Sequence, residues 1–182
     1  MLHKDQTDEE IIQSIRVWIE RSVIGLNLCP FAKPVYSKGL IRYVVTRVSL
    51  EEALLLDLKR ELEDLAGQTL NGYETVLLIH PNVLCDFLDY NDFLNPAEQL
   101  VSSLGLDGII QIASFHPDYQ FAGTMQTDMR NYTNRSPFPL LHLLLEDSID
   151  KAVDSYPDID KILNRNIKTM NKLGLDGWNN LS

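Results

Sequence analysis

Apolar residues recur at helical spacing close to the start of the chain. Thr7 can cap this segment, and Glu10 three residues later completes the pattern of a capping box. Four apolar positions then follow on one helical face: Ile11, Ile15, Trp18 and Ile19. The pattern predicts a first helix that Gly25 ends.

Three later segments are rich in β-branched residues and predict strands. They lie at Leu40–Val48, Thr75–His80 and Ile109–Phe115. A leucine-lined face over Leu54–Leu65 predicts a helix between the first two, and Pro96–Gly105, with proline at its first position, predicts one before the third. Because each connection between strands contains a helix, we expect parallel pairing with right-handed crossovers.

The last part of the chain predicts two further helices. Ser136-Pro137 is a common helix start, and the apolar run after it predicts a helix to about Ser155. An apolar stripe over Asp158–Leu173, which Gly174 ends, predicts the second. The sequence therefore predicts one α/β domain over residues 1–182, with a small, mainly parallel sheet of three or four strands flanked by helices and followed by two C-terminal helices.

Composition limits the possible functions. The 182 residues carry a formal net charge of -10, and lysine and arginine are scattered rather than gathered into a stripe. Nucleic-acid binders need basic surface to neutralise phosphates, so this class is disfavoured. The start of the chain lacks a signal-peptide pattern, and its apolar stretches fall well short of the roughly 18 residues of a membrane span. With only two cysteines, we expect a cytoplasmic protein that binds neither nucleic acid nor membrane.

Two predicted strands end in the same dipeptide, His80-Pro81 and His116-Pro117. In open parallel sheets ligands bind beyond the carboxyl ends of the strands, so both histidines would border one crevice if the strands are neighbours. Histidine is the side chain most easily poised for proton transfer near neutral pH, and Asp118 could orient an imidazole. We therefore take His116, His80 and Asp118 as candidate catalytic residues. The alternative is that each histidine caps its strand and bonds a loop carbonyl.

A long polar loop, from His116 to Arg135, follows the third strand. Loops longer than about 12–15 residues are uncommon in compact domains and are often functional when ordered. Its candidate ligand-binding residues are Tyr119, Gln120, Asn134 and Arg135. The loop leads into the predicted helix at Ser136, whose free amide groups, together with the planar donors of Arg135, would attract an anion. The alternatives are an ordinary solvated connection and an Arg135 that pairs with a nearby acid.

Cysteine and metal chemistry have less support. Cys29 is kept as a candidate ligand-binding residue, but no second cysteine follows at Cys-x-x-Cys spacing, and a buried, inert thiol is favoured over a reactive one. His80 and His116 with Asp118 or Asp128 could ligate a metal, yet no paired ligand spacing occurs, so we predict no metal site. The chain has no P-loop, dinucleotide or nucleophile-elbow motif, so the sequence specifies no cofactor.

Three stretches of unusual composition resemble a known family. They are GLNLCPFAKPV (Gly25–Val35), SFHPDYQFAG (Ser114–Gly123) and NYTNRSPFPLLHLLLEDSI (Asn131–Ile149), with Trp18 before them. Together they resemble the bacterial domain-of-unknown-function family 1415, and the resemblance covers most of the chain. It implies no activity, cofactor or catalytic residue, so the functional hypotheses depend on the physical properties of the residues.

Two functions fit these residues. In the first, the chain is a small enzyme acting on an anionic metabolite at the carboxyl ends of the strands, with Arg135 and the Ser136 helix start holding the anion and His116 moving protons. In the second, it is a non-catalytic binding or adaptor protein whose 116–136 loop recognises a small ligand or a protein partner through Tyr119, Phe121 and Tyr132. An enclosed cleft holding histidine and arginine would favour the enzyme, and a flat aromatic patch the adaptor. The sequence leaves the substrate, the reaction and the oligomeric state open.

Overall fold

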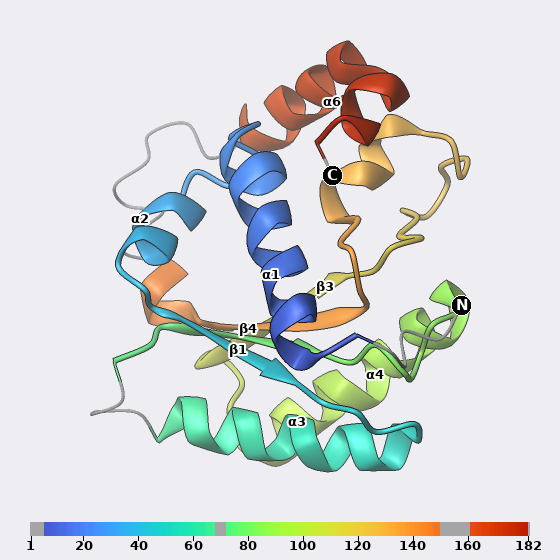
Figure 1. Ribbon diagram of the computed structural model, residues 1–182. Coiled ribbons are helices and arrows are strands. Elements are labelled where there is room, and N and C mark those ends of the chain that lie inside the picture. The colour runs from blue at the N-terminus through green and yellow to red at the C-terminus, as the bar shows by residue number, and fades with distance from the viewer. Residues whose placement is uncertain (1–5, 68–71, 150–160, 182) are drawn as a thin grey trace.

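The computed structural model describes residues 6–67, 72–149 and 161–181 (Figure 1). Along the chain the elements are α1 (Asp8–Trp18), the π-helix η1 (Ile19–Ile24), α2 (Ala32–Ser37), β1 (Ile41–Val45), α3 (Glu51–Ala66), β2 (Thr75–Ile79), α4 (Phe87–Ser103), β3 (Ile110–Phe115), the 3-10 helix η2 (Met129–Asn134), β4 (Leu140–Leu145) and α6 (Ile162–Asn179). The capping box of Thr7 and Glu10 starts α1 as predicted.

The four strands form one mixed sheet in the order β1-β2-β4-β3. β1 and β2 pair in parallel, whereas β4 lies antiparallel to both β2 and β3. The predicted α/β class, with a small sheet flanked by helices, is confirmed, but the mainly parallel pairing is wrong. The three predicted strands do run in one direction. β4 enters between β2 and β3 and makes two of the three pairings antiparallel.

β4 stands where the sequence predicted a helix starting at Ser136. Over residues 136–145 that helix is wrong, because Ser136 precedes an extended strand of five leucines and one histidine, but residues 146–149 are helical. A short continuous apolar run fits a central strand as well as a buried helix, and periodicity alone does not separate them. Here the run is hydrogen-bonded on both edges and packed on both faces, so tertiary contacts override the helix propensity of leucine. The expected end near Ser155 lies outside the described residues.

Two other helix boundaries differ from the prediction. α4 begins directly after Asp86, whose carboxylate accepts two main-chain N–H bonds, and Pro96 lies inside this helix rather than at its start. α6 covers most of the helix predicted over 158–173, of which residues 158–160 lie outside the described ranges. It also continues past Gly174, which has φ 65° and ψ 176° and therefore kinks the helix instead of ending it.

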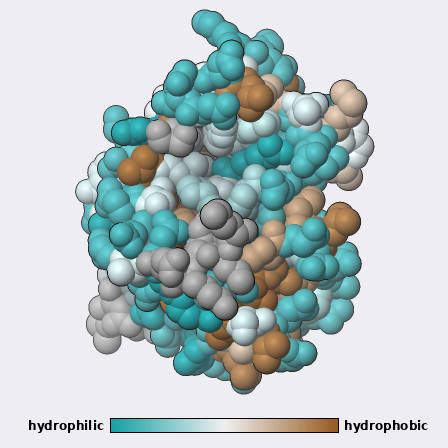
Figure 2. Space-filling view, turned by 45° about the vertical axis from the view of Figure 1, so that its right-hand side comes forward, coloured by the Kyte–Doolittle hydropathy of each residue, from teal (hydrophilic) through white to brown (hydrophobic). Residues whose placement is uncertain are grey.

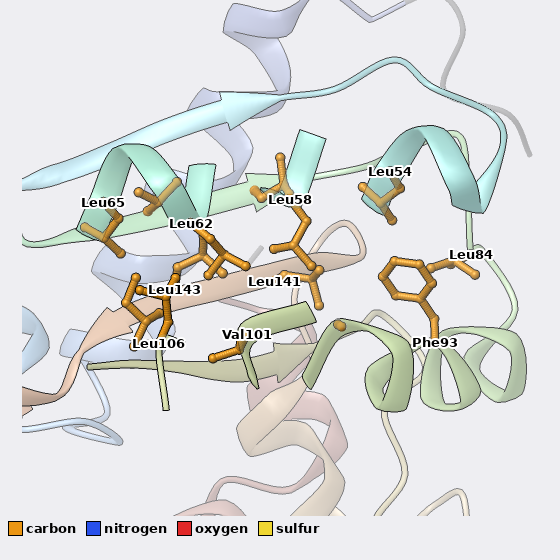
Figure 3. Packing of buried hydrophobic residues seen from close by; sticks show 14 of the residues in the cluster. Leu54, Leu58, Leu62, Leu65, Leu84, Phe93, Val101, Leu106, Leu141 and Leu143 are labelled. Carbon is orange, nitrogen blue, oxygen red and sulfur yellow. The ribbon is translucent and has the colours of Figure 1, made fainter. Parts of the chain in front are cut away.

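Helices cover both faces of the sheet. α3 and α4 lie on one face, and α1, α2 and α6 lie on the other side (Figure 1). The first core joins leucines of α3 to β4 (Figure 3): Leu54, Leu58, Leu62, Leu65, Leu141 and Leu143. The second core joins α1 to the other face of the same strands: Ile11, Ile15, Trp18, Ile79 and Leu140. Alternate residues of β4 enter two separate cores, which explains why this strand is apolar along its length.

The outer surface carries scattered apolar side chains. On the face seen in Figure 2, most hydrophobic residues gather in the lower part, where α3 and α4 lie. These helices present exposed leucines at Leu56 and Leu88. Single exposed leucines are normal on protein surfaces and indicate no ligand by themselves. None of the helices in the described ranges has the length and apolar character that crossing a bilayer requires.

Tyr90 of α4 holds the ends of β3 and β4 together. Its side chain is fully buried, and its hydroxyl donates to the carbonyl of Leu140 (2.8 Å) while accepting the N–H of Phe115 (3.0 Å). Leu140 and Phe115 are the last paired residues before the two strands separate. Tyr90 therefore fixes the position from which the long loop leaves the sheet.

We expect Tyr90→Phe to lower the free energy of unfolding by about 2 kcal/mol, because two buried main-chain groups lose their partner. Urea denaturation measures the change. Tyr119→Phe is the matched control, since the Tyr119 hydroxyl has only a 3.5 Å contact with the hydroxyl of Ser114. Equal losses in the two variants would contradict this role of Tyr90.

Candidate ligand-binding site

The two predicted catalytic histidines lie at one edge of the sheet but not on neighbouring strands. β4 separates β2 and β3, whose ends carry them. His80 and His116 are both fully buried, and their rings pack against Tyr90 with centroid distances of 5.8 and 5.1 Å. The fold therefore brings them together through Tyr90 in the interior, rather than at the rim of an open crevice.

Main-chain groups occupy both ring nitrogens of His116. Its Nδ1 accepts the N–H of Asp118 at 3.0 Å, so Nε2 carries the proton and donates to the carbonyl of Leu84 at 3.2 Å. Burial lowers the pKa of His116, which favours the neutral ring. The side chain of Asp118 is exposed. This geometry matches the alternative in which the histidine ties loops together at a strand end.

His80 has one bonded and one unbonded ring nitrogen. Its Nδ1 donates to the carbonyl of Val83 at 3.0 Å, and its Nε2 has no hydrogen-bond partner among the residues that the structure describes. Burial lowers the pKa of His80 to about 4, so the ring is neutral at physiological pH and Nε2 carries a lone pair. Because the ring is fully buried, His80 is a core residue and does not face an open site.

The long loop is ordered around one buried side chain, Asn131 of η2. Its Oδ1 accepts the N–H of Phe121 at 3.0 Å and the hydroxyl of Thr124 at 2.8 Å. Its Nδ2 donates to the carbonyl of Met125 at 2.8 Å. Asn131 is fully buried, so the loop has its own internal support and is not a simple solvated connection.

Three of the predicted binding residues also support this loop. Gln120 donates to a loop carbonyl at 2.6 Å, and Asn134 donates to the carbonyl of Ser114 at 3.2 Å. The ring of Tyr119 packs 4.9 Å from the ring of Phe121. These contacts use the side chains within the loop, so they hold its shape rather than point to a ligand.

The loop fixes the guanidinium of Arg135. Its Nε donates to the carbonyl of Tyr119 at 3.2 Å and its Nη2 to the carbonyl of Gln126 at 2.9 Å, and the group lies 4.1 Å above the ring of Tyr132. Within the described ranges no carboxylate lies within 4.0 Å of it. Nη1 and the second hydrogen of Nη2 make no hydrogen bond with the described residues and can donate to another group.

A cavity of about 560 Å³ opens beside Arg135. Its walls come from α1 and η1, from the end of the long loop, and from the C-terminal half of α6. Aromatic and polar side chains line it, among them Trp18, Ser22, Tyr132, Arg135, Ser136 and Trp178. Pro117 and Pro137, next to the ends of β3 and β4, place the cavity at the strand-end edge. Its volume lies in the range of about 300–1,000 Å³ that is usual for small-molecule sites.

Of the predicted site residues, Arg135 and Ser136 line this cavity together. Ser136 is buried, and its hydroxyl donates to the carbonyl of Phe138 at 2.6 Å. Because no helix begins at Ser136, helix amide groups do not contribute to anion binding there. His80 and His116 are not among the residues that line the cavity.

Thiol and metal chemistry find little support. Cys29 lies away from the cavity wall, and burial raises the pKa of its thiol despite the nearby charge of Arg165. A thiol with a raised pKa stays protonated and is a poor nucleophile. Across residues 6–67, 72–149 and 161–181, no group of three or more histidine, cysteine or acidic side chains is placed to hold a metal ion.

Among the cavity residues that sequence reasoning missed are Ser22 and Trp178. Ser22 follows Trp18 by four positions and so continues the buried face of α1, where periodicity calls for an apolar residue. Trp178 lies beyond Gly174, where the sequence predicted the end of the helix, and its ring packs 5.4 Å from that of Tyr132. The sequence offered one signal for each residue. Ser22 is a polar residue on an apolar stripe, and Trp178 is a tryptophan after the last predicted element.

The fold and the cavity define a small mixed-sheet α/β protein with a ligand-sized site at one edge of its sheet. The model of the family described as protein of unknown function (DUF1415) matches residues 10–180, so the chain belongs to this family. The predicted resemblance is thereby confirmed. Neither the curated proteins nor the solved structures give a match.

Proposed function

We propose that this protein binds a small organic anion in the cavity beside Arg135. The observation that carries the proposal is the guanidinium, which two loop carbonyls and an aromatic ring hold in place at the wall of a ligand-sized cavity. A partly buried cation is stabilised by an opposite charge, and the described residues supply none within 4.0 Å. The acid group of a ligand would fill that role.

The rest of the cavity suits a flat apolar body. Trp18 and Trp178 lie on walls formed by different helices, and Leu175 and Leu181 add aliphatic surface. Trp18 is held in place by a T-shaped contact with Phe115 at 5.4 Å. Rigid aromatic walls bind planar ligands at low entropic cost. The ligand class that we propose is therefore an aromatic or other planar carboxylic acid.

Binding of a small ligand, which belongs to the second hypothesis drawn from the sequence, fits the geometry better than proton transfer by His116 or an adaptor surface. Proton transfer by His116 would break one of the two main-chain bonds of its ring, and His116 does not line the cavity. An adaptor surface would need exposed aromatic side chains, whereas Tyr119 and Tyr132 are half-buried against other rings. The proposal therefore keeps the anion and Arg135 and leaves out catalysis.

We expect Arg135→Gln to weaken the binding of aromatic carboxylates about tenfold, because a charge-assisted pair becomes a neutral hydrogen bond. Isothermal titration with phenylacetate and indole-3-acetate measures the loss. The corresponding primary amides carry no charge and should bind the variant and the unaltered protein equally, which separates loss of charge from loss of loop structure.

Arg130→Gln is the matched control for this experiment. Arg130 lies in the same loop, is exposed, pairs with Asp128 at 2.6 Å and does not line the cavity. We expect it to leave carboxylate binding unchanged. Equal weakening by the two variants, or none by Arg135→Gln, would count against the proposed function.

A further inference from the structure

The hydroxyl of Ser22 is a polar group without a partner at the cavity wall. Ser22 is 3% exposed, belongs to the π-helix η1 and lines the cavity. Its hydroxyl makes no hydrogen bond with any residue in the part of the chain that the structure describes. Because this hydroxyl bonds none of the described residues and lies at the cavity wall, it can bond a group of a ligand that enters there.

Ser14 on the same helix provides a direct comparison. It also lines the cavity, but its hydroxyl donates to the carbonyl of Glu10 at 2.9 Å, four residues back, as serine commonly does inside a helix. The helical path is wider around Ser22, where the N–H of Gly25 bonds to the carbonyl of Glu20, five residues back. Of the two serines on this wall, Ser14 therefore has a hydrogen-bond partner for its hydroxyl within its helix, and Ser22 does not.

The position of Ser22 in the sequence supports a role beyond packing. The residues before it on the buried face of α1 are Ile11, Ile15 and Trp18, so a polar residue one turn later breaks the apolar pattern. Single-turn π-helical segments inside helices are frequent at functional sites. Residues that break the local sequence pattern are expected at functional sites more often than in the core.

We infer that Ser22 is a specificity-determining residue that hydrogen-bonds a ring hydroxyl of the ligand. The inference rests on the proposed function and narrows its ligand class from planar carboxylic acids to hydroxylated aromatic acids. Arg135 stands on the loop wall and Ser22 on the η1 wall, so the two side chains contact separate parts of one ligand. A serine hydroxyl both donates and accepts, which suits a phenolic hydroxyl.

The test compares phenylacetate with its 2-, 3- and 4-hydroxy forms by isothermal titration, so that each ring position is sampled. We expect at least one hydroxylated isomer to bind the unaltered protein about tenfold more tightly than phenylacetate, because a site built to hydrogen-bond a hydroxyl discriminates against the analogue that lacks it. Ser22→Ala should reduce this ratio to about one. Ser14→Ala, on the same wall, should keep the full ratio.

Each outcome bears on the inference. A preference for a hydroxylated isomer that Ser22→Ala removes and Ser14→Ala keeps supports it. No preference in the unaltered protein, or a preference that survives Ser22→Ala, overturns it, and the proposed function still stands if Arg135→Gln weakens all four acids. Failure of all four acids to bind overturns both the inference and the proposed function.

Discussion

Replacing Asn131 with alanine is expected to lower the free energy of unfolding by about 3 kcal/mol and to loosen the whole loop between β3 and β4. The side chain is fully buried and satisfies the N–H of Phe121, the hydroxyl of Thr124 and the carbonyl of Met125. Alanine removes three hydrogen bonds and leaves the N–H of Phe121 without a partner, whereas the Thr124 hydroxyl keeps the carbonyl of Phe121 and the Met125 carbonyl keeps the N–H of Asp128. Partial access of water to the loop keeps the expected loss below that of a sealed core site.

Urea denaturation measures the stability of Asn131→Ala, and limited proteolysis near Met125 measures the opening of the loop. Thr133→Ala is the control, because the hydroxyl of Thr133 bonds its near neighbours in η2, the carbonyl of Arg130 and the Oδ1 of Asn134, and supports no distant part of the loop. We expect the control to lose less than about 1 kcal/mol and to resist proteolysis as the unaltered protein does. A variant of Asn131 as stable and as resistant as the control would show that the loop depends on other contacts.

The same substitution connects loop structure to the proposed site. One of the two carbonyls that position Arg135 belongs to Gln126, within the turn that Asn131 holds, and Nδ2 of Asn131 lies 3.5 Å from that carbonyl. Loosening the loop should therefore displace the guanidinium without changing its charge. Carboxylate binding should weaken in Asn131→Ala even though Arg135 is intact, as expected when a preorganised binding group loses its support.

Much of the fold follows from local patterns in the sequence. The capping box at Thr7, the leucine face of α3 and the β-branched segments at β1, β2 and β3 each appear close to where the patterns predict them. β4 does not, because Leu140–Leu145 has neither helical nor alternating periodicity, and only its neighbours in space make it a strand. Predicting a helix for this segment also left β4 out of the sheet. The predicted pairing was therefore mainly parallel, because it was based on the helical connections between the other three strands.

For the candidate site too, local sequence patterns indicate some residues, and the packing of distant segments decides the rest. The length and composition of the 116–135 loop directed attention to Arg135, which lines the cavity. The assumption of neighbouring parallel strands placed His80 and His116 at an open crevice, and the inserted β4 removes that geometry. Ser22 and Trp178 lie far apart in the sequence, and the packing of α6 against η2 and the end of the chain against η1 brings them together at one cavity.

Lowering the pH from 7 to 4 is expected to reduce the free energy of unfolding by about 3 kcal/mol through His80 alone. Burial lowers the pKa of His80 from 6.5 to about 4 in the folded protein. Below pH 6.5 the unfolded chain therefore binds a proton that the folded protein does not, and stability falls until the folded pKa is reached near pH 4. Above pH 6.5 the ring is neutral in both states and this contribution is constant. Each unit of difference corresponds to about 1.4 kcal/mol.

Urea denaturation at pH 7, 5.5 and 4 isolates this contribution when the unaltered protein is compared with His80→Asn, which retains an N–H donor for the carbonyl of Val83. The variant should be less stable at pH 7, since a smaller side chain leaves space beside Tyr90. Its further loss down to pH 4 should be about 3 kcal/mol smaller than that of the unaltered protein. Carboxylates and His142, whose pKa burial also lowers to about 4, are common to both proteins and cancel in the comparison. Equal acid losses in the two proteins would mean that His80 takes up its proton equally well in the folded and unfolded states.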